Sequence, residues 1–109
     1  MTGKPAAPTH LKPATKVWFT DVSSSYQLEE HHLMLLTLAG EAWDRVVQAR
    51  KIIDKEGLTF VTRFGEPKAR PEIAIERDNR IAFARLMREL ALDVEPPAES
   101  PRPTRRGGQ

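Results

Sequence analysis

Cysteine is absent from this 109-residue chain, which excludes disulfide bonds, thiolate catalysis and cysteine-ligated zinc sites. Long apolar runs are also absent, so the sequence predicts neither a membrane-spanning helix nor the apolar stretch of a signal peptide. The sequence lacks a glycine-rich phosphate loop as well, and we expect no nucleotide hydrolysis. The length suffices for one domain with a modest core.

Residue types that support catalysis are present, but their arrangement is not that of an active site. His31 and His32 are adjacent, so on a helix they point about 100° apart and do not share a metal at the usual helical spacing. A loosely held ion shared with another subunit is one interpretation, and a polar first helical turn is the other. Ser23, Ser24 and Ser25 lack a nucleophile motif, and their hydroxyl groups are suited to capping the next helix. We therefore expect a protein that is not an enzyme, without cofactor or metal.

The net charge is only +2, but the charges are unevenly distributed along the chain. Residues 1–20 carry three lysines and no acid, whereas residues 21–44 carry five acids and neither lysine nor arginine. Residues 45–70 carry seven basic residues against three acids. Five basic residues of this middle segment are expected to gather at one tip of the molecule and contact DNA phosphates: Arg50, Lys51, Arg63, Lys68 and Arg70. Lys12 and Lys16 on the first helix form a second candidate patch, and the alternative for both patches is a solubilising surface. The candidate DNA contacts, two of them on the first helix, are Lys12, Lys16, Arg50, Lys51, Arg63, Lys68 and Arg70.

The apolar pattern predicts three helices. Pro13 is a favourable first residue for a helix that extends to about Val22. A long helix follows from about Leu28 to Glu56, and Gly57 is suited to end it in a left-handed conformation. The last helix extends from Pro71 to about Leu92.

Between the two long helices the sequence alternates in the manner of a β-strand. The β-type run Leu58–Thr62, a turn at Phe64–Pro67 and the segment Lys68–Arg70 predict a small hairpin or an extended loop. We therefore expect a mainly α fold, with a short N-terminal helix and a hairpin of two long helices. Residues 1–10 are predicted as a disordered arm, residues 11–92 as the helical DNA-binding and oligomerisation domain, and residues 93–109 as a flexible tail.

The long helix carries apolar side chains on two faces. The positions Leu35, Ala39, Ala42, Val46, Ala49 and Ile53 follow a 4-3-4-3-4 spacing, which resembles a coiled-coil seam. Either both faces pack within one chain, or the second face packs against another copy. The candidate oligomer contacts are Leu35, Leu36, Ala39, Ala42, Trp43, Val46 and Val47.

Three blocks of sequence, in this order, resemble the small subunit of tailed-bacteriophage terminases, and more narrowly the short helical class found beside HK97-like phages. The first block is His10–Trp18, and the second is Tyr26–Leu28 followed by Leu35–Arg45. The third joins Glu56–Thr59 through Arg70–Asp78 to Arg88–Leu92. The chain departs from the pattern at Lys12, where a capping serine is usual, and at Ala91, where glycine is common.

The resemblance implies a protein without catalytic activity that assembles as a ring on viral double-stranded DNA. Such a subunit recognises the start of packaging and recruits and regulates the large terminase subunit, which holds the ATPase and the nuclease. It also implies a location in the host bacterial cytoplasm and no membrane partner. The competing interpretation of the residues themselves is a small helical regulatory module that does not bind DNA.

Overall fold

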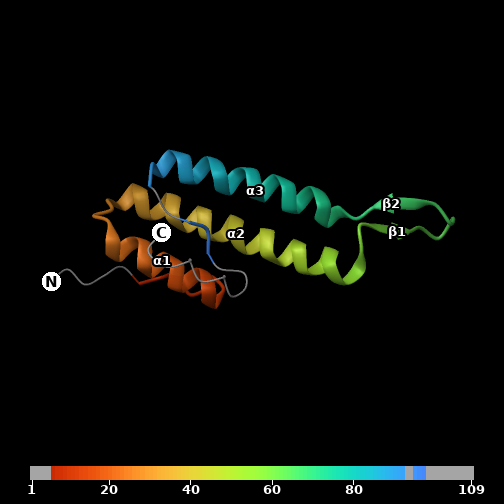
Figure 1. Cartoon of the computed structure of the whole chain (residues 1–109), viewed down its shortest axis with the longest axis horizontal. Coiled ribbons are helices and arrows are strands. Elements are labelled where there is room, and N and C mark those ends of the chain that lie inside the picture. The colour runs from red at the N-terminus through yellow and green to blue at the C-terminus, as the bar shows by residue number, and fades with distance from the viewer. Residues whose placement is uncertain (1–5, 93–94, 98–109) are drawn as a thin grey trace, which may run out of the picture.

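The computed structural model describes residues 6–92 and 95–97, and in this part of the chain three helices and one β-hairpin form a mainly α fold (Figure 1). The elements are α1 (Pro13–Ser25), α2 (Glu30–Glu56), β1 (Thr59–Val61), β2 (Pro67–Ala69) and α3 (Pro71–Leu90). Helices α2 and α3 run antiparallel, α1 lies along the other side of α2, and the hairpin projects beyond the helices (Figure 1). The predicted fold class is confirmed, including a hairpin between the long helices.

The predicted helix ends are correct to within about three residues. The role predicted for the three serines near the end of α1 is not correct. Ser23, Ser24 and Ser25 lie inside α1, where their hydroxyl groups donate to the carbonyl oxygens of Thr20 and Asp21 at 2.7–3.2 Å. The prediction that these serines cap the next helix is therefore wrong, because each hydroxyl donates to a carbonyl oxygen one turn back in α1.

Helix α2 is capped from within its own first turn instead. The backbone N–H of Glu29, the N-cap residue, donates to Nδ1 of His32 at 3.1 Å. At the other end, Gly57 adopts a positive φ of 91° and ends the helix. This backbone conformation favours glycine, as the sequence predicts.

The core surrounds α2, because α1 and α3 cover different sides of it. Trp18 of α1 and Trp43 of α2 both contact the ring of Phe83 on α3, with centroid distances of 5.9 and 5.0 Å. Leu36 and Val46 are fully buried beside them. Both apolar faces of α2 therefore pack within one chain, and three aromatic rings join all three helices.

The seven candidate oligomer contacts all pack in or against this core, so their burial requires no second copy of the chain. Leu35 and Val47 are half-buried against the core, and the other five are buried in it. A contact between copies through these side chains stays a prediction, and the single chain leaves little of their surface for it. The five buried residues are Leu36, Ala39, Ala42, Trp43 and Val46.

The start of α1 lies unusually close to α2 at Gly40. A Cβ atom at Gly40 would lie 3.1 Å from Cγ2 of Thr15 and 3.3 Å from Cδ1 of Leu11. Leu11 and Thr15 are buried at this contact. The absence of a side chain at Gly40 therefore sets the distance at which the two helices pack.

Part of the predicted N-terminal arm and part of the predicted C-terminal tail contact the helices. His10 Nε2 lies 2.7 Å from the Glu41 carboxylate of α2. Glu95 contacts α1, since Trp18 Nε1 donates to its carbonyl oxygen at 2.8 Å, and Pro97 is buried. The remainder of the predicted arm and tail, residues 1–5, 93–94 and 98–109, lies outside the described residues.

Candidate nucleic-acid interface

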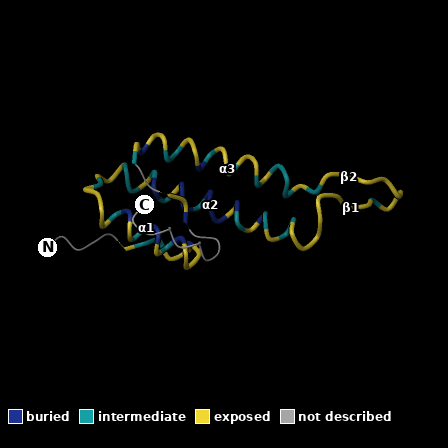
Figure 2. The backbone as a smooth tube through the Cα atoms, viewed as in Figure 1, coloured by how far each residue is buried: buried dark blue, intermediate teal, exposed yellow. Residues whose placement is uncertain are grey.

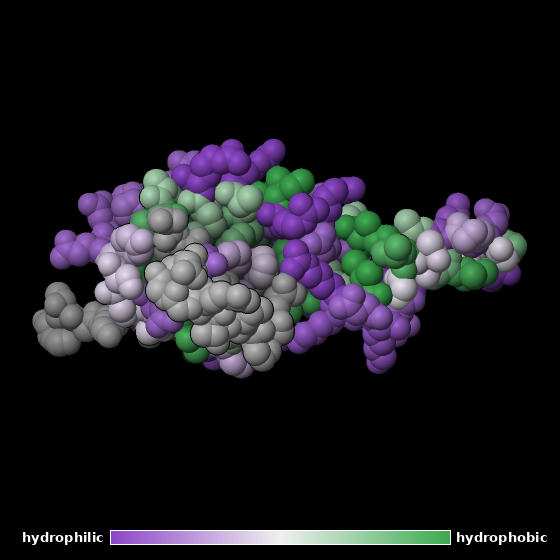
Figure 3. Space-filling model, in the orientation of Figure 1, coloured by the Kyte–Doolittle hydropathy of each residue, from purple (hydrophilic) through white to green (hydrophobic). Residues whose placement is uncertain are grey.

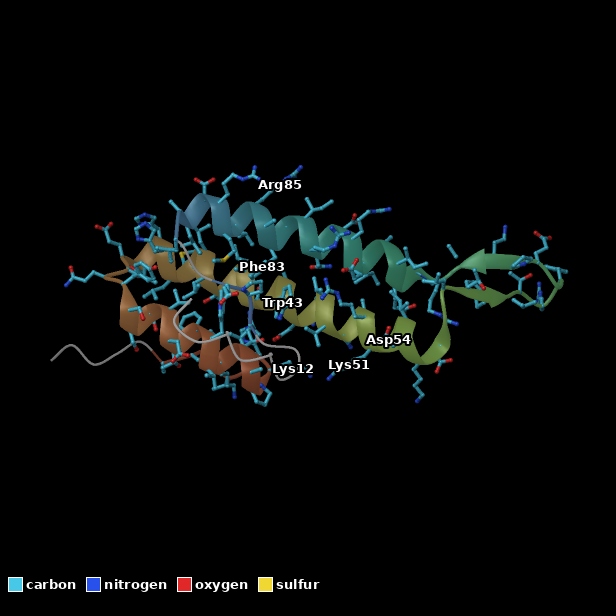
Figure 4. All side chains as sticks on the ribbon, viewed as in Figure 1. Lys12, Trp43, Lys51, Asp54, Phe83 and Arg85 are labelled. Carbon is cyan, nitrogen blue, oxygen red and sulfur yellow. The ribbon has the colours of Figure 1, made fainter. Side chains whose placement is uncertain are left out.

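Lys12 and Lys51 line the same surface cavity although they come from different helices. Lys12 is the N-cap residue of α1, and Lys51 lies near the C-terminal end of α2. The cavity has a volume of about 300 Å³, and Trp43 and Val47 also line it. Figure 4 shows both lysines on one side of the molecule, with Arg85 on the opposite side, along α3. Two of the predicted DNA contacts are thus brought together by tertiary packing.

Asp44 explains how Lys12 can occupy the start of a helix without capping it. The Lys12 side chain makes no capping hydrogen bond. Instead, the buried Asp44 carboxylate of α2 accepts a hydrogen bond from the Lys12 backbone N–H at 2.9 Å and one from the Thr15 hydroxyl at 2.5 Å. An acceptor from another helix thus satisfies a free donor of the first turn. Sequence reasoning missed this role, because Asp44 lies far from α1 along the chain.

The three lysines near the start of α1 remain available to a partner. Within residues 6–92 and 95–97, none of the amines of Lys12, Lys16 and Lys51 forms an ion pair. Lys12 and Lys51 are exposed, and Lys16 is half-buried. Asp54 lies on the same side (Figure 4) and lowers the positive potential there. We refer to Lys12 and Lys51, together with Lys16 one helical turn after Lys12, as the lysine face.

Arg50 holds α2 and α3 together. Its Nε lies 3.1 Å from a carboxylate oxygen of Glu76, and its guanidinium group lies over the Trp43 ring, 5.5 Å from the centroid. Arg80 approaches the same Glu76 oxygen at 3.2 Å. The Arg50 side chain is two-thirds buried, so a large share of its surface is already used within the chain.

Arg70 also has hydrogen-bond partners within the chain, at the base of the hairpin. Its Nε donates to the Gly57 carbonyl oxygen at 2.9 Å, and its Nη2 donates to those of Glu56 and Thr59 at 3.2 Å. Cationic groups stabilise the carbonyl end of a helix. Arg70 therefore clamps β1 to the end of α2.

The two remaining candidates, Arg63 and Lys68, lie on the exposed hairpin. The Arg63 guanidinium group stacks over the Phe64 ring at 4.9 Å, and the Lys68 amine lies 3.7 Å from the Glu66 carboxylate. The structure thus divides the seven candidates into the lysine face, two side chains on the hairpin, and two arginines with internal partners. Of the five residues predicted to gather at one tip, Lys51 lies beside Lys12, Arg63 and Lys68 lie on the hairpin, and Arg50 and Arg70 have partners within the chain.

The described residues contain no group of three or more histidine, aspartate and glutamate side chains that could hold a metal ion. The rings of His31 and His32 lie 4.0 Å apart, and His31 Nδ1 lies 3.7 Å from a Glu29 carboxylate oxygen. Over the same residues, no helix is both long enough and apolar enough to cross a bilayer.

Comparison with known proteins identifies the family. Searches of curated proteins and of solved structures found no match to this chain. A scan against protein-family models matches residues 16–100 to the family described as phage terminase, small subunit. The match covers α2, the hairpin and α3 completely and α1 from Lys16 onward, and it agrees with the resemblance of the sequence blocks. Because it extends over most of the chain, this protein belongs to the phage terminase small subunit family.

Proposed function

We propose that this protein is a non-catalytic adaptor for viral DNA packaging. It binds double-stranded viral DNA in the host cytoplasm, assembles as a ring, and recruits and regulates the large terminase subunit. Family membership supports the packaging role. The observation that carries DNA binding is the lysine face, where Lys12 and Lys51 from two helices lie beside one cavity. A modest patch of this kind, repeated around a ring, provides many phosphate contacts from a chain of almost neutral charge.

The test of DNA binding is fluorescence anisotropy with a duplex of about 30 base pairs at several salt concentrations. Each phosphate contact contributes about 0.9 to the slope of log K against log salt concentration. Replacing Lys12 and Lys51 by alanine removes two candidate contacts. We therefore expect the salt dependence to become shallower, with the magnitude of the negative slope smaller by about 2.

The matched control is the double replacement of Arg85 and Arg88 by alanine. It removes the same charge from exposed positions of α3, and Arg85 lies on the opposite side of the molecule (Figure 4). We expect its slope to remain close to that of the unmodified protein. Equal effects of the two variants would assign DNA binding to net charge alone. No binding even at low salt would favour the small regulatory module.

Ring assembly requires exposed apolar surface, and the hairpin provides it. Both strands are exposed along their whole length, and the apolar side chains of the hairpin stand out between polar neighbours (Figures 2 and 3). Val61 is 68% exposed and Phe64 74% exposed. An isolated two-stranded hairpin is marginally stable in water, and exposed apolar patches mark sites of association. We therefore include the hairpin in the proposed contact between copies.

Native mass spectrometry at low micromolar concentration tests the assembly. Head-to-tail contacts produce a closed ring when the rotation between copies closes, and the double replacement of Val61 and Phe64 by serine is expected to shift the ring toward monomer. Replacing the exposed Met34 of α2 by serine is the control for a single apolar surface residue away from the hairpin. A monomer at every concentration would contradict the ring, and an unaltered ring in the hairpin variant would exclude this contact.

A further inference from the structure

The first turn of α1 has backbone N–H groups that no part of the described chain satisfies. Pro13 has no N–H, and the Lys12 N–H donates to Asp44. The next two donors, the N–H groups of Ala14 and Thr15, form no hydrogen bond with any residue that the structure describes. The Lys12 side chain does not cap them. The positive end of the α1 dipole is therefore open to an acceptor.

These two donors border the cavity beside the lysine face. Ala14 and Thr15 line it together with Lys12, Gln48 and Lys51. Within residues 6–92 and 95–97, neither lysine amine forms an ion pair. At about 300 Å³ the cavity has room for one phosphate group. Two amines and a helix N-terminus thus border one small space, and this is the arrangement by which proteins bind phosphate.

Trp43 carries a further donor at the same place. It lines the cavity, is only 7% exposed, and lies between Phe83 and the two lysines (Figure 4). Among the described residues, nothing accepts a hydrogen bond from its indole Nε1. A buried donor without an acceptor costs free energy, and such a group in a folded protein points to a ligand. It indicates, independently of α1, that the cavity takes a group rich in acceptor oxygens.

The charges around the cavity favour a group with one negative charge. The charged residues that line it are Lys12, Lys51 and Asp44, which leaves one positive charge in excess. Both oxygens of the Asp44 carboxylate already accept hydrogen bonds, from the Lys12 N–H and from the Thr15 hydroxyl. A phosphodiester has a single negative charge and two unbridged oxygens, so one backbone phosphate of DNA matches both the charge and the donors.

We propose that one backbone phosphate of the bound DNA sits in this cavity, held by the N–H groups of Ala14 and Thr15 and by the amines of Lys12 and Lys51. The inference rests on the proposed DNA binding and assigns the atoms of one contact. It also explains the advantage of lysine at the N-cap of α1. Serine, threonine, asparagine or aspartate there would satisfy the same N–H groups with its own side chain. The contact would fix the orientation of the protein on the duplex.

The test compares Lys12→Ser with Lys12→Ala in the full chain, by fluorescence anisotropy with a DNA duplex. Both variants lose the amine, but only the serine hydroxyl can accept from a free N–H group of α1. We expect Lys12→Ser to bind DNA about fivefold more weakly than Lys12→Ala, because it occupies a donor that otherwise bonds to a charged phosphate. The salt slope should be equal in the two variants, since they carry the same charge.

Thermal unfolding should give the opposite order, with Lys12→Ser more stable than Lys12→Ala, because the hydroxyl caps α1. A merely structural role of position 12 would move stability and DNA affinity in the same direction. Lys12→Asn, another favoured cap, is the second variant and should behave as Lys12→Ser does. Circular dichroism checks that all three variants are folded.

The matched control is the pair Arg85→Ser and Arg85→Ala. Arg85 is exposed inside α3, on the opposite side of the molecule (Figure 4). A serine there caps no helix, so we expect the two control variants to bind DNA equally. Inorganic phosphate alone is the second probe. Compared with chloride at the same ionic strength, it should raise the melting temperature of the unmodified protein, and this effect should disappear in Lys12→Ser.

The outcomes separate this inference from the proposed function. If the unmodified protein binds DNA and the serine and alanine variants at position 12 bind it equally, the inference is overturned while DNA binding stands. If inorganic phosphate stabilises the protein but those variants still bind DNA equally, the cavity takes free phosphate only, and the inference is also overturned. Absence of DNA binding by the unmodified protein would remove the proposed function and this inference with it.

Discussion

The Thr15 hydroxyl of α1 donates a 2.5 Å hydrogen bond to Oδ1 of Asp44 on α2, across 29 positions of sequence. The other carboxylate oxygen accepts the Lys12 backbone N–H. One buried carboxylate thus fixes the start of α1 against α2, and this contact brings Lys12 to the cavity that Lys51 also lines. The lysine face depends on it.

Asp44→Ala is expected to lower the free energy of unfolding by about 3 kcal/mol, because it removes two hydrogen bonds to a charged acceptor and leaves two donors without a partner. Urea denaturation followed by circular dichroism measures the change. The control is Asp54→Ala on the same helix, which removes an exposed carboxylate and should change stability by less than about 0.5 kcal/mol. Similar losses in both variants would show that Asp44 has no special structural role.

Gly40→Ala should destabilise the protein, although alanine is the better helix former. The helix propensity favours alanine by about 1 kcal/mol, but the new Cβ would lie 3.1 Å from Cγ2 of Thr15. Thr15 is held in place by Asp44, so we expect overpacking to prevail and the melting temperature to fall. Adding Thr15→Ser, which keeps the hydroxyl and removes the methyl group, should restore much of the loss. A rise in melting temperature for Gly40→Ala alone would contradict this account.

Ala91→Gly should stabilise the protein by about 0.5–1 kcal/mol. Ala91 follows α3 with a positive φ of 56°, in the left-handed region where a Cβ atom is unfavourable. Ala84→Gly is the matched control, because Ala84 is an exposed residue inside α3 and glycine there costs about 1 kcal/mol. Thermal unfolding of the two variants should therefore give shifts of opposite sign. Destabilisation by both would mean that the strain at Ala91 is negligible.

Arg70→Ala should release the hairpin from the end of α2, since three carbonyl oxygens lose their donor. Hydrogen exchange measured by mass spectrometry is expected to become at least tenfold faster at backbone amides in residues 57–69, with little change in α1. Arg63→Ala removes the same charge from the hairpin tip, where Arg63 stacks on Phe64, and should leave the exchange at the hairpin base unchanged. Unchanged exchange in Arg70→Ala would show that the clamp contributes little.

The order of the helices and strands and most of their ends could be predicted from the sequence alone. Pro13 and Pro71 each begin a helix, Gly57 ends α2, and the alternating run after Gly57 forms β1. These features depend on backbone conformation and on contacts within one helical turn, so nearby residues suffice to predict them. The sequence blocks also indicated the family, which the match over residues 16–100 confirmed.

Which side chains the helices present to each other and to solvent depends on how the helices pack. Periodicity located two apolar faces on α2, but it could not show that α1 covers one of them within the same chain. The cap from Asp44, the clamp by Arg70 and the hydrogen bond from Trp18 to Glu95 connect residues 29, 13 and 77 positions apart. Such contacts arise from the packing of whole helices, and no local pattern encodes which donor meets which acceptor.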